Sequence, residues 1–122
     1  MKEVKIDGKV YVEKSTQSNR IELAKPKGGL PYKIVRTYSA GVFAGYLKER
    51  KGKEATILNA RRLWYWSGAN SLSQLAMEGT KTPNTCKFPC EVNKIVLTEV
   101  IEILDVTKQA QESIQGVKIW EQ

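Results

Sequence analysis

Residues 32–68 read YKIVRTYSAGVFAGYLKERKGKEATILNARRLWYWSG, and they carry the clearest strand pattern in the chain. β-Branched and aromatic residues occur here in short runs separated by small or turn-forming residues. Strands are predicted at residues 32–39 and 42–50, on either side of Ala40-Gly41. The run RKGKE is predicted to turn the chain into further strands over ATIL and ARRLWYWSG. The stretch therefore predicts an antiparallel meander.

The N-terminal side continues the strand pattern more weakly. Residues 4–12 place Asp7-Gly8, a dipeptide favoured in type I′ turns, between two apolar runs, which predicts a β-hairpin. Residues 15–31 hold many turn formers and two of the four prolines. They predict a loop with room for a short strand near residues 21–24.

Helix signals appear only after this meander. In NSLSQLAMEG, Asn70 or Ser71 can cap a short helix, Gln74 stands three residues after Ser71 as in a capping box, and Gly79 can end the helix. Farther on, TKQAQESIQG predicts one or two helical turns with Thr107 as the cap.

The remaining C-terminal segments read as strands. KIVLTEVIEILDVT alternates apolar and polar residues, which predicts one strand or two half-buried strands, and VKIW predicts a last strand. The whole chain therefore predicts an α+β fold, mostly an antiparallel β-sheet built as a meander of hairpins, with one or two short helices. Its length of 122 residues favours a single domain, residues 1–122.

Composition excludes several kinds of chemistry. The chain has no histidine, so no mechanism can use imidazole as a base, proton shuttle or metal ligand. Its acids are scattered and form no magnesium-binding cluster. Cys86 and Cys90 alone cannot fill a structural zinc site, and we expect a pair of buried thiols in a reducing cytoplasm. We therefore predict no enzyme activity, no metal and no cofactor.

Targeting signals are weak. The N-terminal sequence MKEVKIDG contains no apolar leader region, and no apolar stretch approaches the roughly 18 residues of a membrane-spanning helix. We expect a cytoplasmic protein that does not insert into a membrane.

Positive charge is concentrated in the first half of the chain. Residues 1–63 hold 15 Lys and Arg against 6 acids, whereas residues 64–122 hold 5 against 7, which accounts for the net charge of +7. Such a field attracts phosphate-bearing ligands or nucleic acid, but a solvated basic surface is an equally good interpretation. Charge alone does not assign a function.

The first candidate ligand site lies in ARRLWYWSGANSLSQ. Strand alternation would place Arg62, Trp64 and Trp66 on one face and Arg61 on the other, and these four are candidate ligand-binding residues. Indoles stack on nucleobases and arginine binds phosphate, although the tryptophans can equally fill the core.

The same segment runs into a helix start, where backbone N–H groups favour an anion. Asn70 and Ser71 are therefore added as candidate ligand-binding residues. The pattern GxxxxGK of a Walker loop is absent, so the signal is weak.

The second candidate site is RTYSAGVFAGYL. Arg36, Tyr38 and Ser39 offer a cation and two hydroxyls close to Gly41 and Gly45. Glycines inside a strand pattern indicate a bulge or a close backbone approach, and a tight hairpin with close strand packing explains them at least as well.

Three segments, in this order, carry a family resemblance: RTYSAGVFAGYL, ARRLWYWSGANSLSQLAMEG and KIVLTEVIEIL. They span roughly residues 32–105 and resemble a family of small phage proteins similar to the Thoeris anti-defence sponges. The resemblance implies a non-enzymatic homo-oligomer, a dimer or larger, that acts in the host cytoplasm. Such a protein sequesters glyco-cyclic ADP-ribose made by a host TIR enzyme, and related members are implied to bind cyclic oligonucleotides.

The residues are compatible with ligand capture because Arg, Trp and Tyr gather near a predicted helix start without a catalytic set. We therefore expect a cyclic nucleotide signalling molecule and a second copy of the chain as partners. A small basic single-stranded nucleic-acid-binding protein is the main alternative. An inhibitor that binds a host protein through its tryptophans is a third possibility.

Overall fold

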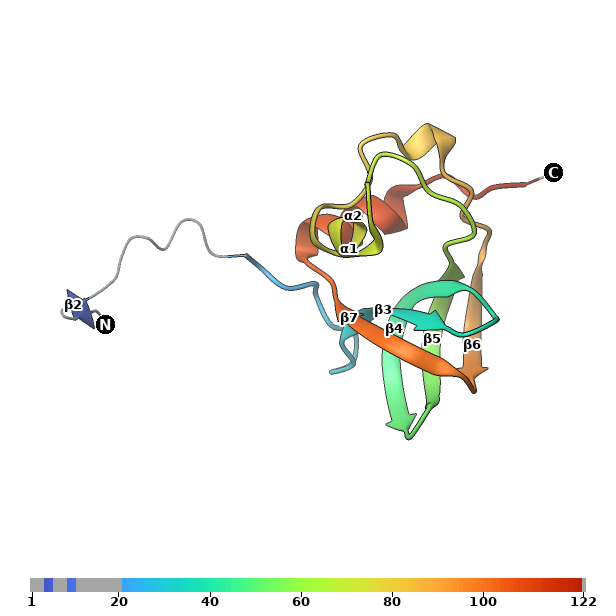
Figure 1. Ribbon diagram of the computed structural model, residues 1–122, viewed down its shortest axis with the longest axis horizontal. Helices are drawn as coiled ribbons and strands as arrows, with labels where there is room; N and C mark the ends of the chain where they lie inside the picture. The colour runs from blue at the N-terminus through green and yellow to red at the C-terminus, as the bar shows by residue number, and fades with distance from the viewer. Residues whose placement is uncertain (1–3, 6–8, 11–20, 122) are drawn as a thin grey trace.

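The computed structural model describes residues 4–5, 9–10 and 21–121. Its main unit is a five-stranded antiparallel sheet with the strand order β6-β5-β4-β3-β7 (Figure 1). The strands are β3 (Tyr32–Thr37), β4 (Val42–Lys51), β5 (Glu54–Arg62), β6 (Glu91–Leu97) and β7 (Val100–Asp105). Two α-helices and one 3₁₀ turn complete it: α1 (Leu72–Glu78), α2 (Lys108–Gly116) and η1 (Pro83–Thr85). The predicted α+β class is confirmed.

A separate two-stranded hairpin lies at the N-terminal end. β1 (Val4–Lys5) pairs antiparallel with β2 (Lys9–Val10), which confirms the predicted hairpin. The predicted Asp7-Gly8 turn and residues 15–20 of the predicted loop lie outside the described residues. The short strand expected near residues 21–24 is reduced to one bridge between Leu23 and Thr107.

The sheet is strongly curved. β6 and β7 lie at opposite edges of the strand order, yet only Thr98 and Glu99 join them. So short a connection requires the two edges to meet at one corner, as Figure 1 shows. Backbone hydrogen bonds hold this corner: Val100 donates to the Lys53 carbonyl and Tyr38 to the Glu99 carbonyl, both at 2.9 Å.

Strand alternation divides the buried residues into two cores. In β3, Ile34 and Val35 are both fully buried but belong to different cores, because successive side chains point to opposite faces. The inner core lies within the curl of the sheet and consists of Val35, Phe43, Ala55, Ile57, Ala60, Leu97 and Val100. The helix-side core consists of Tyr32, Ile34, Ala44, Leu63, Leu75, Ala76, Cys86, Phe88, Val106, Ala110, Ile114 and Val117.

A bulge bends β5 against β4. Ala44 pairs with Arg61 and Tyr46 with Leu58, so Asn59 and Ala60 together face the single residue Gly45. Asn59 adopts a left-handed conformation with φ of 51°. This confirms the close backbone approach predicted at Gly45.

The second glycine of that segment has a different role. Gly41 has φ of 103° in the tight connection between β3 and β4, a conformation that a side chain would strain. The tight hairpin that the sequence also allowed is therefore present beside the bulge.

Both predicted helices are confirmed with their caps. The Ser71 hydroxyl accepts from the Gln74 N–H at 3.1 Å and the Thr107 hydroxyl accepts from the Ala110 N–H at 3.0 Å. Gly79 ends α1 with φ of 80°. None of the helices in the described ranges is long and apolar enough to cross a membrane.

Three local predictions are wrong. ARRLWYWSG does not form a strand throughout, because β5 runs unbroken from Glu54 and ends at Arg62. VKIW is no strand, since only Ile119 forms a bridge, with Phe88. Residues that favour strands form a strand only where a neighbouring strand can pair with them through backbone hydrogen bonds. Cys86 is buried as expected, whereas Cys90 is exposed.

Candidate functional site

A partly exposed cluster of aromatic side chains lies at the end of the molecule opposite the β4–β5 turn. We call its members, Trp64, Tyr65, Lys87 and Trp120, the aromatic platform. The indoles of Trp64 and Trp120 stack with ring centroids 5.2 Å apart and planes inclined by 8°. Trp64 is 59% exposed and Tyr65 is 48% exposed. Stacked rings at this distance attract each other, but so much exposed indole surface is not needed for a core.

Three segments from distant parts of the sequence build this platform. Tyr65 and Lys87 exchange backbone hydrogen bonds, at 3.3 and 2.8 Å, which align the chain after β5 with the chain before β6. Phe88 is fully buried and anchors that second segment in the helix-side core. The Trp120 N–H donates to the Phe88 carbonyl at 3.0 Å, which brings the C-terminal segment alongside.

Lys87 supplies positive charge at the centre of the platform. Its ammonium lies 5.6 Å from the ring centroid of Trp64, 5.7 Å from that of Trp120 and 5.8 Å from that of Tyr65. The lysine is exposed, so its donors can reach a ligand. Indole faces stack on flat bases and an ammonium binds phosphate, which together suit a nucleotide.

A cavity of about 290 Å³ extends the platform beyond Trp120. Asn84 adds an amide, Lys118 a second ammonium and Glu121 one carboxylate to its lining. A ligand on the platform can therefore contact further polar groups without any rearrangement of the sheet.

Arg61 is one predicted site residue that the structure places in the interior. It is only 4% exposed, and its guanidinium donates to the carbonyls of Pro89, Ile114 and Phe88. Burial lowers the pKa of Arg61, but the ordinary pKa of an arginine is so high that the side chain stays charged. With its donors directed to the main chain, Arg61 is a structural residue.

The predicted wall of Arg62, Trp64 and Trp66 is not formed. Arg62 is exposed and its guanidinium lies 4.7 Å from the ring centroid of Phe43. Trp66 is partly buried against the helix-side core. The alternation fails because β5 ends at Arg62, so the residues after it do not keep a two-residue repeat. Of the three, Trp64 alone joins the platform.

The predicted anion site at the start of α1 is largely occupied by the protein itself. The Asn70 N–H donates to the Gln74 side-chain oxygen at 2.7 Å, and the Gln74 N–H donates to Ser71. The capping interactions that start the helix thus use the donors that an anion would need. Asn70 and Ser71 act as helix-starting residues here.

The other predicted site lies beside the β3–β7 edge. Arg36 forms an ion pair with Glu102 at 2.9 Å, and the Ser39 hydroxyl donates to Glu99 at 2.6 Å. Tyr38 is 78% exposed. The two carboxylates make this edge less favourable for phosphate than the aromatic platform.

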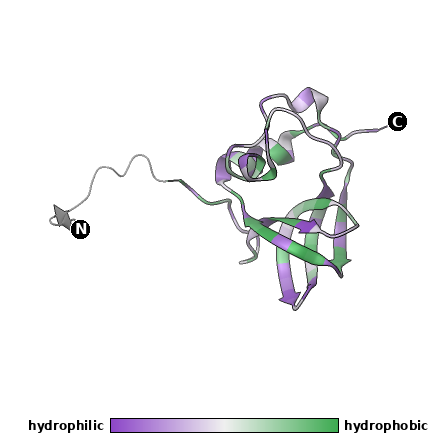
Figure 2. Ribbon diagram, viewed as in Figure 1, coloured by the Kyte–Doolittle hydropathy of each residue, from purple (hydrophilic) through white to green (hydrophobic). Residues whose placement is uncertain are grey.

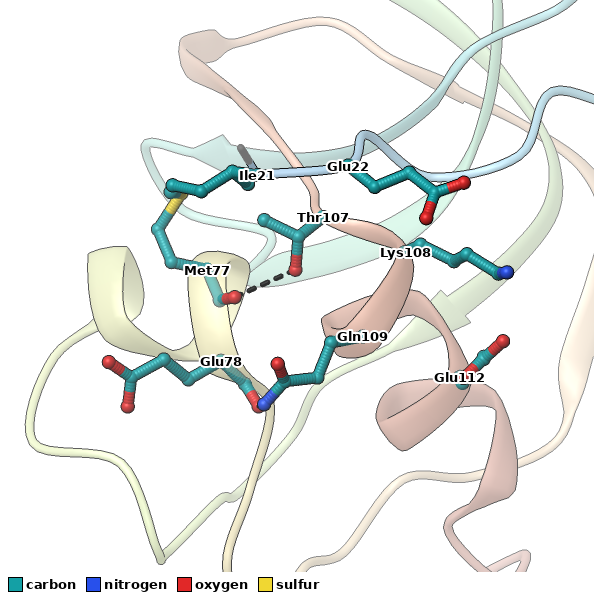
Figure 3. A pocket seen from close by; sticks show the side chains of 8 residues that line it. All are labelled: Ile21, Glu22, Met77, Glu78, Thr107, Lys108, Gln109 and Glu112. Atoms are coloured by element: carbon teal, nitrogen blue, oxygen red, sulfur yellow. Dashed lines mark hydrogen bonds between the residues drawn. The ribbon is translucent and has the colours of Figure 1, made fainter. Parts of the chain in front are cut away.

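A second cavity, of about 550 Å³, also has unsuitable chemistry for phosphate. Figure 3 shows Glu22, Lys108 and Glu112 along one side of it, and Glu78 also lines it. Thr107 donates to the Met77 carbonyl at 2.7 Å, so its hydroxyl is already engaged. Three carboxylates against one ammonium repel an anionic ligand.

A family model described as a domain of unknown function, DUF6948, matches residues 30–114. The chain belongs to the DUF6948 family. The match includes the whole five-stranded sheet, and also Trp64 and Lys87 of the platform, but it ends before Trp120. Among curated proteins and among solved structures, no match to this DUF6948 protein was found.

Sequence reasoning missed Tyr65, Lys87 and Trp120 as site residues. Trp120 is visible in the sequence as an aromatic residue in VKIW, and Lys87 stands between the two cysteines in TCKFPC. Neither local pattern indicates that the two residues meet. Their meeting depends on the backbone hydrogen bonds at Phe88 and Tyr65, which join segments that lie far apart in the sequence.

Proposed function

We propose that this DUF6948 protein binds a phosphate-bearing cyclic nucleotide on the aromatic platform and releases it unchanged. The observation that carries the proposal is the stack of exposed Trp64 on half-buried Trp120, with the Lys87 ammonium near both rings. Stacking of a base on an aromatic side chain contributes about 1–3 kcal/mol, and a charge-assisted hydrogen bond about 1.5–3 kcal/mol. Binding, rather than turnover, suits such a set of groups.

The family resemblance of the sequence supplies the identity of the proposed ligand. A Thoeris-type sponge would capture glyco-cyclic ADP-ribose in the host cytoplasm and keep a TIR-dependent effector inactive. This ligand offers a flat base and two phosphates, which match the indole faces and the ammonium groups of Lys87 and Lys118.

The platform is open on its outer side, so a second copy of the chain is proposed to complete the enclosure. β6 is an edge strand, and two of its hydrophobic side chains, Val92 and Val96, are 48% and 50% exposed. Figure 2 shows hydrophobic residues along both edge strands. Exposed apolar residues on a free edge favour association of chains.

A thermal-shift and calorimetric panel tests the proposal. The panel holds glyco-cyclic ADP-ribose, cyclic dinucleotides and cyclic trinucleotides, with linear ADP-ribose as the control ligand. A true ligand at a hundred times its Kd stabilises the folded protein by about 2.7 kcal/mol. Heat denaturation of the complex should release the bound ligand chemically unchanged. Catalytic amounts of a cleaved product would show an enzyme, and no stabilisation by any cyclic nucleotide would refute capture.

Nucleic-acid binding is the second candidate because of the β4–β5 turn. Lys48, Arg50, Lys51 and Lys53 are all exposed in this one hairpin. A basic hairpin binds the phosphate backbone of a polymer with a steep salt dependence, and each lost phosphate contact lowers the slope of log affinity against log salt concentration by about one. Titration with single-stranded oligonucleotides at two salt concentrations distinguishes this candidate from capture of a small ligand.

A further inference from the structure

Arg61 lies beneath the aromatic platform and contacts the two segments that carry Lys87 and Trp120. Its Nη2 donates to the Phe88 carbonyl at 3.0 Å and its Nε to the Pro89 carbonyl at 3.0 Å. Its Nη1 donates to the Ile114 carbonyl, in the last turn of α2, at 2.9 Å. One side chain thus joins the segment after Lys87 to the helix that leads into Trp120.

The Phe88 carbonyl links Arg61 directly to the platform. It accepts one hydrogen bond from Arg61 and another, also of 3.0 Å, from the Trp120 N–H. A carbonyl oxygen has two lone pairs, so the two donors complete its capacity together. The position of this oxygen therefore determines where the Trp120 backbone lies.

The chemistry of the site argues for orientation rather than simple packing. Burying a cation is costly, and an apolar side chain would fill the same space without that cost. The three acceptors are main-chain carbonyls from two segments, and only the flat, multiply donating guanidinium can align them at once. A lysine would keep the positive charge, but its single ammonium group cannot donate in the three directions that the guanidinium serves.

We propose that Arg61 is a positioning residue that assembles the aromatic platform by holding Trp120 against Trp64. Its effect on ligand affinity rests on the proposed function, whereas its effect on the stack does not. The stack has its own signature, because two indoles in contact give an exciton couplet in far-ultraviolet circular dichroism without any ligand.

The test compares Arg61→Lys with Arg50→Lys, the same substitution at an exposed position of β4. Trp120→Phe defines the spectrum without the stack. Arg61→Lys should lose the couplet, keep cooperative thermal unfolding and bind glyco-cyclic ADP-ribose about tenfold more weakly. Arg50→Lys should keep the couplet and change affinity by less than about twofold. A folded Arg61→Lys protein with an intact couplet overturns the inference.

Hydrogen exchange in the unmodified protein covers the case in which Arg61→Lys does not fold. If Arg61 holds the Trp120 backbone, the Arg61 side-chain N–H groups and the Trp120 amide open together and exchange with one opening free energy. Exchange of the Trp120 amide through a separate, much easier opening overturns the inference. Failure of the unmodified protein to bind any cyclic nucleotide, with a couplet that depends on Arg61, refutes the proposed function and leaves the positioning role standing.

Discussion

Trp64 and Trp120 stack with their ring planes only 8° apart, although one follows strand β5 and the other stands 56 residues later, after helix α2. The contact joins the two ends of the segment 64–120, which contains both helices. It also leaves Trp64 more than half exposed, which a purely structural aromatic pair would not require.

Removing either indole should weaken nucleotide binding. Trp64→Ala and Trp120→Ala are each expected to cost about 1–3 kcal/mol of binding free energy, because each removes a stacking surface. The double variant should cost less than the sum, since the two rings support each other. Isothermal titration measures all three, with the exposed Tyr38→Ala as the control that keeps affinity. Full affinity in both single variants would place the ligand elsewhere.

Lys87 should matter more than the lysines of the β4–β5 turn. Lys87→Ala is expected to lose about 1.5–3 kcal/mol of affinity for a phosphate-bearing nucleotide, the range of a charge-assisted hydrogen bond. Lys51→Ala combined with Lys53→Ala should change this affinity little. If the double lysine variant instead weakens binding as strongly as Lys87→Ala and lowers the slope of log affinity against log salt concentration, the ligand binds at the basic turn.

Gly45→Ala should destabilise the sheet. A Cβ at this position would lie 2.5 Å from the Ile57 Cγ2 and 2.8 Å from the Leu58 carbonyl oxygen, which belongs to the backbone and cannot move freely. We expect a loss of about 1–3 kcal/mol in the free energy of unfolding, measured by chemical denaturation. Gly116→Ala is the control: a Cβ there meets nothing within 4 Å, so stability should stay equal or rise. Equal stabilities for both variants would contradict the close approach at the bulge.

Alkaline pH should destabilise the protein through Tyr32. Burial is the main cause that raises the pKa of Tyr32, with smaller contributions from Tyr46 and Glu91. An unfolded tyrosine ionises near pH 10, so the stabilisation by the neutral hydroxyl is complete below about pH 10. It is lost above that value by up to about 1.4 kcal/mol per pH unit. Tyr32→Phe should show a flatter decline of unfolding free energy, and an unchanged slope would refute this role.

Light scattering should report a dimer or larger assembly. The free edge of β6 carries exposed Val92 and Val96, and enclosing a nucleotide requires more surface than one small domain offers. Replacing both valines with lysine should shift the mass toward a monomer and weaken ligand binding. A monomeric unmodified protein with full affinity would show that one copy suffices.

Local sequence patterns were sufficient for most elements of secondary structure. The alternation in YKIVRT and VFAGYL, the caps Ser71 and Thr107 and the final Gly79 all depend on residues a few positions apart. Such short-range preferences act before any tertiary contact forms. The α+β class, the order of strands and helices, and both helix starts were therefore predictable.

Only the tertiary structure decided which side chains form the candidate site. The sequence placed Arg61 at a ligand, but long-range carbonyls from Phe88, Pro89 and Ile114 draw it into the interior. Trp120 reaches Trp64 because backbone hydrogen bonds at Phe88 align segments far apart in the chain. The end of β5 at Arg62 likewise depends on where backbone pairing with β4 and β6 stops. Contacts between distant residues are set by the packing of the whole sheet, which no local period in the sequence encodes.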